Sequence, residues 1–362
     1  MSESHANHVE PSGVLTEFPR YATSSVGAVE RPRPGPVPPI NRLLFFLTLL
    51  TTTMAGAYMA GADLAIVHPF RSIWQLTWGL TFSIPLMFIL GSHEMGHFIV
   101  SWRNRVEATW PYFIPAPYPS VFFLGTFGAF IRMKSVVRSR RVMFDIGAAG
   151  PWAGALVAIP ITFVGLMMST VTPLDASQGG IQLGNSLIFL ALTKAALHVD
   201  PDTVNINLHP TALAGWVGLF VTTLNLLPVG QLDGGHVTYA LFGRRHGVIS
   251  VLCVIGCILM VFVPFFTSLP FWWGWLVWAG LLLFLGLQHP STADVDTPLD
   301  KPRRLAAWLT IALFVVTFSP VPLWFAEPTE PQPQQEKSYE VMHVLPHSAE
   351  NTPHRIAIHF GA

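Results

Sequence analysis

The stretch TWGLTFSIPLMFILGSHEMGHFIVS, from Thr77 to Ser101, is an apolar run that contains two histidines and a glutamate. It is long enough to cross about 30 Å of hydrocarbon as an α-helix. His93 and His97 are four residues apart, so they share one helical face, and Glu94 is next to the first. Charged groups at this depth cost about 2 to 3 kcal/mol each, which favours a functional reason for their presence.

The composition of the whole chain agrees with a membrane environment. Charged residues make up 11% and hydrophobic residues 51%, whereas a soluble protein carries about 25% charged residues. A soluble enzyme is therefore largely excluded, and a net charge of zero removes the electrostatic case for a nucleic-acid partner. The two cysteines allow neither a disulfide framework nor a cysteine-based zinc site.

Apolar runs predict the fold class, which is an all-α polytopic membrane protein with six or seven transmembrane helices. The runs long enough to cross a bilayer are 43–64, 77–101, 144–168, 209–228, 247–267, 271–289 and 305–326. The stretch 181–197 is weaker because Asn185, Thr193 and Lys194 interrupt it. We interpret it as a surface helix or a partial insertion.

The same pattern divides the chain into regions. We predict a disordered Pro-rich cytoplasmic arm at 1–42, a first transmembrane helix with an external loop at 43–76, a membrane core that contains the two histidines at 77–290, a cytoplasmic loop with the last transmembrane helix at 291–326, and a mostly disordered tail at 327–362.

Lysine and arginine in short loops predict the orientation. The loop 102–141 carries seven of them, namely Arg103, Arg105, Arg132, Lys134, Arg138, Arg140 and Arg141. The segment 169–208 carries only Lys194. The basic loop is expected on the cytoplasmic side, together with the N-terminus and the active site, while the tail lies outside. We expect an integral protein of a bacterial cytoplasmic membrane.

The His-Glu-x-x-His pattern is typical of zinc enzymes, because two neutral imidazoles one turn apart can bind one Zn²⁺ ion while the glutamate takes a proton from water. A catalytic zinc usually has three protein ligands, so a third is needed. The end of the fourth span, Asn225-Leu-Leu-Pro-Val-Gly-Gln-Leu-Asp-Gly-Gly-His236, supplies two candidates. On chemistry alone, Asp233 and His236 are both open as the third ligand.

These two motifs together resemble the site-2 protease family of intramembrane zinc metalloproteases, peptidase family M50. Further similarity, to the branch without an inserted PDZ domain, lies in Pro111-Tyr-Phe-Ile-Pro115, Gly125-Thr-Phe-Gly-Ala-Phe130 and Phe144-Asp-Ile-Gly-Ala-Ala-Gly-Pro151. The resemblance implies that His93, His97 and Asp233 bind zinc, that Glu94 activates water, and that Asn225 contacts substrate. The family pattern thus favours Asp233 over His236.

The resemblance implies a metalloendopeptidase that hydrolyses peptide bonds in or near transmembrane segments, as in regulated intramembrane proteolysis. Its expected partners are a transmembrane protein substrate and the lipid bilayer, with no nucleic acid. Two alternatives remain at this stage: a metal transporter that uses the same histidine and aspartate cluster, and an inactive protease-like scaffold.

Two further stretches bear on the site. Residues 121–134 are too short for a helical crossing and contain Gly125 and Gly128, which favours a membrane-embedded β-hairpin over a helical span. The resemblance implies that such a hairpin receives the substrate as an extended strand; the alternative is a packed loop without a substrate role. Small residues Gly147, Gly150, Ala153 and Gly154 surround Pro151. They predict close packing of the third span against the helix of the His-Glu-x-x-His motif.

Overall fold

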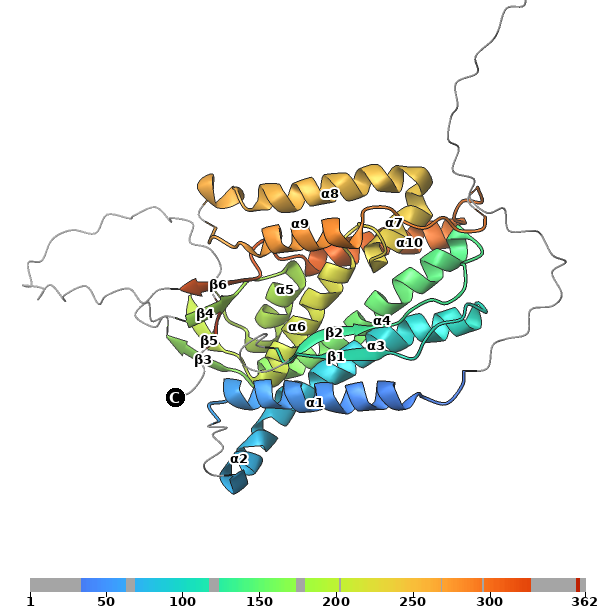
Figure 1. Cartoon of the computed structure of the whole chain (residues 1–362). Coiled ribbons are helices and arrows are strands. Elements are labelled where there is room, and N and C mark those ends of the chain that lie inside the picture. The colour runs from blue at the N-terminus through green and yellow to red at the C-terminus, as the bar shows by residue number, and fades with distance from the viewer. Residues whose placement is uncertain are drawn as a thin grey trace, which may run out of the picture.

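The computed structural model describes residues 34–62, 69–116, 124–173, 180–201, 203–267, 269–294, 296–326 and 356–358. Within these residues the chain is mostly helical, in agreement with the predicted class (Figure 1). Most of the predicted arm and tail, including residues 1–33 and 327–355, lies outside the described residues.

Four helices form the centre of the molecule. They are α3 (Leu80–Arg103), α4 (Arg140–Met167), α6 (Pro210–Asn225) and α7 (Asp233–Phe242). Their core-facing residues are small or apolar, and residues such as Phe82, Ile146 and Leu219 are almost fully buried. The helix α1 (Pro39–Met59) packs along α3, while α5 (Leu187–Leu197) packs against α4.

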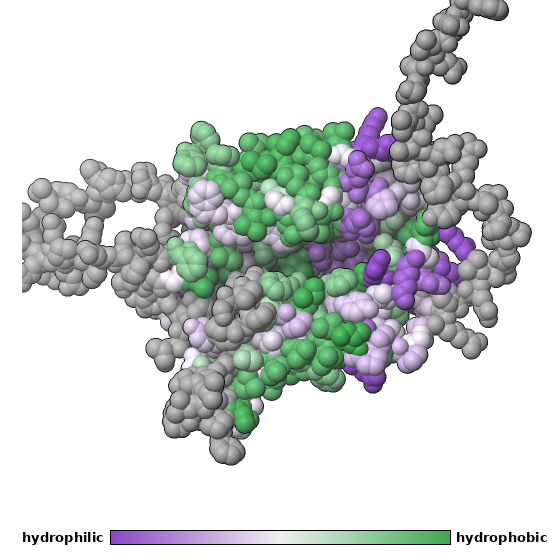
Figure 2. All heavy atoms as spheres, in the orientation of Figure 1, coloured by the Kyte–Doolittle hydropathy of each residue, from purple (hydrophilic) through white to green (hydrophobic). Residues whose placement is uncertain are grey.

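The remaining described helices cover this centre. They are α2 (Pro69–Leu76), α8 (His246–Met260), α9 (Gly274–Leu285), α10 (Lys301–Thr317) and the short 3₁₀ helices Thr77–Gly79, Gly243–Arg245 and Val263–Phe265. Helix α8 presents large apolar side chains such as Val248 and Leu252 to the outside. Figure 2 shows this apolar surface over α8, with hydrophilic side chains gathered at the right-hand end of the view.

Four helical stretches of the described residues are long and apolar enough to cross a membrane: Pro39–Met59, Ile73–Arg103, Arg140–Met167 and Asp233–Met260. The protein is therefore a membrane protein, but the predicted count of six or seven spans is not reproduced. Proline and glycine explain much of the difference. Helix α6 ends before Pro228, and α9 ends at Gly286, so these two helices have only 16 and 12 residues.

The weak stretch 181–197 contains a strand followed by a short helix. Strand β4 (Gly180–Leu183) precedes α5, which has 11 residues and is too short to cross a bilayer alone. Ser186 caps α5 by accepting a hydrogen bond from the Phe189 amide. The interpretation as a surface helix or a partial insertion therefore stays open.

The predicted class, all-α with a possible β-hairpin at 121–134, did not include other sheets, but the described residues contain two more. Strand β3 (Thr170–Pro173) pairs with β5 (Val204–Asn207), and β4 lies between β6 (Leu323–Ala326) and β7 (Ile356–Ile358), all antiparallel. These strands gather at the end opposite the hydrophilic one (Figures 1 and 2).

A third small sheet overlaps the stretch 121–134. Strand β2 (Thr126–Phe130) lies in that range and pairs antiparallel with β1 (Tyr112–Pro115), which precedes it. Residues 117–123, between the strands, lie outside the described residues. Helix α1 packs against β1 (Figure 1). The strand pair therefore lies against protein on this side, while its membrane-embedded position remains a prediction.

Candidate metal centre

Helix α3 places both histidines of the His-Glu-x-x-His motif in the interior. His93, Glu94 and His97 are each at most 6% exposed. Because four residues make slightly more than one helical turn, the two imidazoles lie one above the other on the same face. Their Nε2 atoms are 3.1 Å apart.

Asp233 reaches these histidines from the first residue of α7. The chain reverses between α6 and α7 through Gly230, whose φ of +52° suits glycine. A side chain at Gly234 would overlap the carbonyl oxygen of Leu226. The glycine therefore permits a close approach of the two backbone segments, and this approach brings Asp233 to the face of α3.

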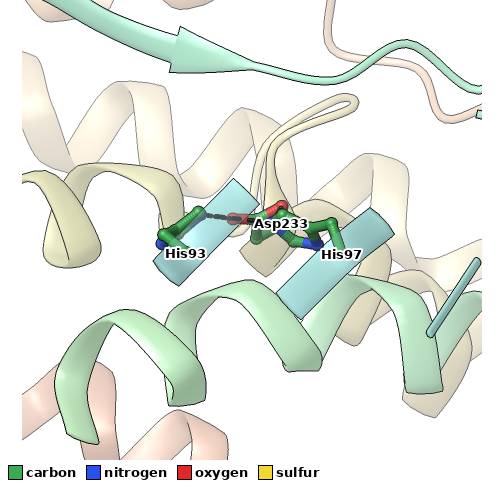
Figure 3. Close-up of side chains that lie close together, drawn as sticks. All are labelled: His93, His97 and Asp233. Atoms are coloured by element: carbon green, nitrogen blue, oxygen red, sulfur yellow. Dashed lines mark hydrogen bonds and ion pairs between the residues drawn. The ribbon is translucent and has the colours of Figure 1, made fainter. Parts of the chain in front are cut away.

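The three side chains converge on one point (Figure 3). Asp233 Oδ2 lies 3.0 Å from His93 Nε2, and Asp233 Oδ1 lies 3.2 Å from His97 Nε2. Tetrahedral zinc with bonds of about 2.0 to 2.1 Å separates its donor atoms by about 3.3 Å. Two imidazole nitrogens and a carboxylate at these spacings fit one Zn²⁺ ion without rearrangement of the backbone.

A backbone carbonyl sets the orientation of His97. Its Nδ1 donates a hydrogen bond of 2.8 Å to the carbonyl oxygen of Ile146 in α4. This bond places the proton on Nδ1 and leaves the Nε2 lone pair directed at the cluster. No sequence signal could have revealed it, because every residue except proline offers the same backbone groups.

The small-residue face of α4 is confirmed as the contact with α3. A side chain at Gly96 would meet the carbonyl oxygen of Ala149 and the methyl of Ala153. A side chain at Gly150 would overlap the imidazole of His97, and one at Gly154 would press on His93. Helix α4 can therefore lie against the back of both histidines only because these positions carry no side chain.

Asn225 and His236 differ in how they meet the cluster. Asn225 Nδ2, at the end of α6, lies 3.3 Å from His93 Nε2. His236 is buried beside the cluster, but its Nδ1 lies 2.6 Å from Nε2 of His289, which in turn donates to the carbonyl of Pro290. Within the described residues, the convergent donor set is His93, His97 and Asp233, without His236.

His289 also contacts an aromatic ring. Its imidazole stacks on the ring of Tyr239 at 4.2 Å between centroids. The sequence placed His289 at the end of a span but did not show that it contacts His236.

The donor cluster opens into a cavity of about 180 Å³. Its walls include Glu94, Asn225 and the residues Ala129 to Ile131 of the β2 region. The Glu94 carboxyl group faces the backbone of Ile131. A buried acid, three metal-binding donors and an amide thus surround one small space.

Comparison with known proteins relates this arrangement to a family. The family described as Peptidase family M50 matches residues 81–263, which include the motifs on α3 and α7. A protein of Oryza sativa subsp. japonica named "Probable zinc metalloprotease EGY1, chloroplastic" is 35% identical over 243 residues, covering 64% of this chain and 38% of that protein.

Proteins of Arabidopsis thaliana give similar matches. The one named "Probable zinc metalloprotease EGY1, chloroplastic" is 33% identical and the one named "Probable zinc metalloprotease EGY2, chloroplastic" is 27% identical. Each match covers 72% of this chain and 45% of the relative. The chain thus spans less than half the length of these curated relatives. No solved structure matches the chain.

The names of these relatives place them in chloroplasts, so they give no support to the bacterial membrane that we expected. The resemblance inferred from the two motifs is confirmed at the level of the family. Because the family match covers half of the sequence and includes both motifs, the chain belongs to peptidase family M50, the site-2 protease family.

Proposed function

We propose that this protein is a zinc-dependent endopeptidase that hydrolyses peptide bonds in or near transmembrane segments of other membrane proteins. The observation that carries the proposal is the convergence of His93, His97 and Asp233 beside Glu94 in a cavity among apolar helices. The names of the plant relatives, which call them probable zinc metalloproteases, support the same chemistry.

The proposed chemistry assigns each side chain a role. Zinc held by the three donors would polarise the scissile carbonyl and make a water molecule more acidic. Glu94 takes the proton of the attacking water and passes it to the leaving amine. The Asn225 amide, at the edge of the cluster, donates a hydrogen bond to the substrate backbone or to its developing oxyanion.

The substrate must be extended where it is cut, because a helix uses its carbonyl groups for its own hydrogen bonds. Strand β2 pairs with β1 along one edge, and it has no second partner among the described strands. Ala129 and Phe130 of β2 line the cavity, and so does Ile131 directly after the strand. We therefore propose that the substrate adds a strand to β2 beside Glu94.

We also propose a seven-span topology in which α8, α9 and α10 cross as short helices with their flanking segments. In this topology the N-terminus, the basic loop before α4 and the catalytic cavity lie on one side of the membrane. The support is the gathering of hydrophilic side chains at the end where α3 ends and α4 begins (Figure 2). That side is the cytoplasm or its organellar equivalent.

Glu94→Gln tests the proposal, because it removes the base and keeps the size of the side chain. In proteoliposomes with a tagged single-pass substrate, the variant should cleave at least about 100-fold more slowly than wild type and retain its zinc. Equal cleavage, or a wild type that holds no zinc, would refute the proposal. Zinc uptake into the vesicles without cleavage would instead identify a transporter.

A further inference from the structure

A second cavity lies beside the chain after β2. It has a volume of about 490 Å³, and its walls are Thr109, Tyr112, Phe130, Arg132, Met133 and Lys134. Phe130 and Met133 also line the catalytic cavity. The two spaces therefore lie next to the same short segment of the chain.

The backbone of this segment pairs with residues 107–109 along one edge. The Thr109 amide donates to the carbonyl of Arg132, and the Lys134 amide donates to the carbonyl of Glu107. Because backbone polar groups alternate between the two edges of an extended chain, Ile131 and Met133 direct theirs to the other edge. That edge is where Ile131 faces Glu94.

A substrate strand on this edge passes two basic side chains. Arg132 and Lys134 follow Ile131 by one and three residues, so at about 3.3 Å per residue they lie within about 10 Å of it. Both side chains are exposed, and neither forms an ion pair with any acid in the described part of the chain. Glu107 is the nearest acid along the paired segment, but it lies beyond ion-pair distance.

We propose that Arg132 and Lys134 select substrates that carry acidic side chains within about four residues of the scissile bond, on the flank that leaves the membrane. The inference rests on the proposed function and adds a substrate class to it. The occupant is an acidic juxtamembrane segment, because two unpaired cations line a cavity that adjoins the catalytic one. The polar end of the molecule, where the segment lies, favours such a flank (Figure 2).

Basic residues at a membrane surface also attract anionic lipid headgroups. Comparison with other basic residues distinguishes a lipid contact from a substrate contact. Arg103 and Arg138 are also exposed on the basic loop, but unlike Arg132 and Lys134 they line neither cavity. A lipid contact predicts that all four basic residues matter equally. A substrate contact predicts that only Arg132 and Lys134 matter, and that they matter only for acidic substrates.

The experiment uses the full chain in phosphatidylcholine vesicles with two single-pass substrates that differ only in the flank, Glu-Glu or Gln-Gln. We expect wild type to cleave the acidic substrate with a kcat/KM about three- to ten-fold higher, a preference that salt weakens. The double variant Arg132→Gln/Lys134→Gln should lose the preference. The matched control Arg103→Gln/Arg138→Gln should keep it.

A charge-reversal variant distinguishes a lost substrate preference from a failure to fold. Arg132→Glu/Lys134→Glu should prefer a Lys-Lys flank over Glu-Glu, which only a folded enzyme can do. Cleavage of both substrates at equal rates by wild type would overturn this inference and leave the proposed function intact. Cleavage of neither would overturn both. If Arg132→Gln/Lys134→Gln lowers kcat/KM equally for both substrates, and only in vesicles that contain phosphatidylglycerol, the two residues bind lipid. That result would overturn the inference.

Discussion

Gly150 lies against the imidazole of His97, so the absence of a side chain at this position is a condition for metal binding. In Gly150→Ala the added methyl group must displace either the imidazole or helix α4, because both are buried and closely packed. We expect zinc affinity to fall at least about 10-fold, the usual effect of disturbing the groups behind a metal ligand. Competition with a calibrated chelator measures it.

Gly256→Ala is the matched control, because Gly256 also lies in an apolar helix but has open space where a methyl group would stand. It should bind zinc like wild type. Unchanged affinity in Gly150→Ala would mean that α3 and α4 pack less tightly than their geometry indicates.

Asp233 and His236 allow a direct comparison of the two candidates for the third ligand. Asp233→Asn removes a charged donor from the cluster and should abolish stoichiometric zinc, whereas His236→Gln should retain it, because His236 is bonded to His289 instead. Metal analysis of the purified variants measures both. Loss of zinc in His236→Gln together with retention in Asp233→Asn would reverse the assignment.

The residues of this site differ in how far sequence could predict them. Helical periodicity alone brings His93 and His97 to one face, so their meeting needed no knowledge of the fold. Asp233 joins them across 140 positions of sequence, and only the family resemblance separated it from His236. The carbonyl of Ile146 could not be predicted, because its role depends on where α4 lies.

At the scale of elements, α1 holds the strand pair by side-chain hydrogen bonds. Asn41 Nδ2 donates to the carbonyls of Trp110 and Pro111 before β1, at 3.0 and 2.9 Å. Thr51 Oγ1 donates to the carbonyl of Gly125 before β2, at 2.6 Å. One helix thus contacts both strands that, in the proposed function, position the substrate.

Thr51→Val keeps the size of the side chain and removes that donor. If the strand pair shifts relative to Glu94, kcat/KM should fall about 3- to 10-fold while the zinc content stays at the wild-type level. Thr53→Val is the matched control, because Thr53 Oγ1 donates only to Leu49 within α1. Similar activity in both variants would remove α1 from substrate positioning.

Elements were predictable where a long apolar run met few interruptions, as in α1, α3 and α4. The sequence did not predict the strands that pair across long separations, such as β4 with β6, because each has only four residues and no alternating pattern of its own. Their formation depends on loops that the helices bring together.

At the scale of the whole molecule, one ion-pair network joins α10 to the catalytic centre. Arg303 donates two hydrogen bonds of 2.8 Å to Asp145, in the turn of α4 that also contains Ile146, and one of 2.6 Å to Asp300. The side chain of Asp300 also caps α10 by accepting from the Arg303 amide. The sequence could not show this pairing, because it requires the fold to bring residues 145 and 303 together.

We expect Arg303→Gln to lower the Tm by about 2 to 4 °C at pH 7, since it removes a bidentate ion pair. Its neighbour Arg304 forms no ion pair in the described part of the chain, so Arg304→Gln should leave the Tm unchanged.

The difference in Tm between these two variants should also depend on pH. Hydrogen bonds from the Arg303 amide and guanidinium hold the pKa of Asp300 below its ordinary value. The part of the stabilisation that comes from Asp300 is therefore complete above about pH 4 and is lost as pH falls through the lowered pKa of Asp300. Melting curves at pH 7, 4 and 3 should show the two variants approaching each other as Asp300 becomes protonated, and a gap that stays constant down to pH 3 would mean that Asp300 contributes nothing to the network.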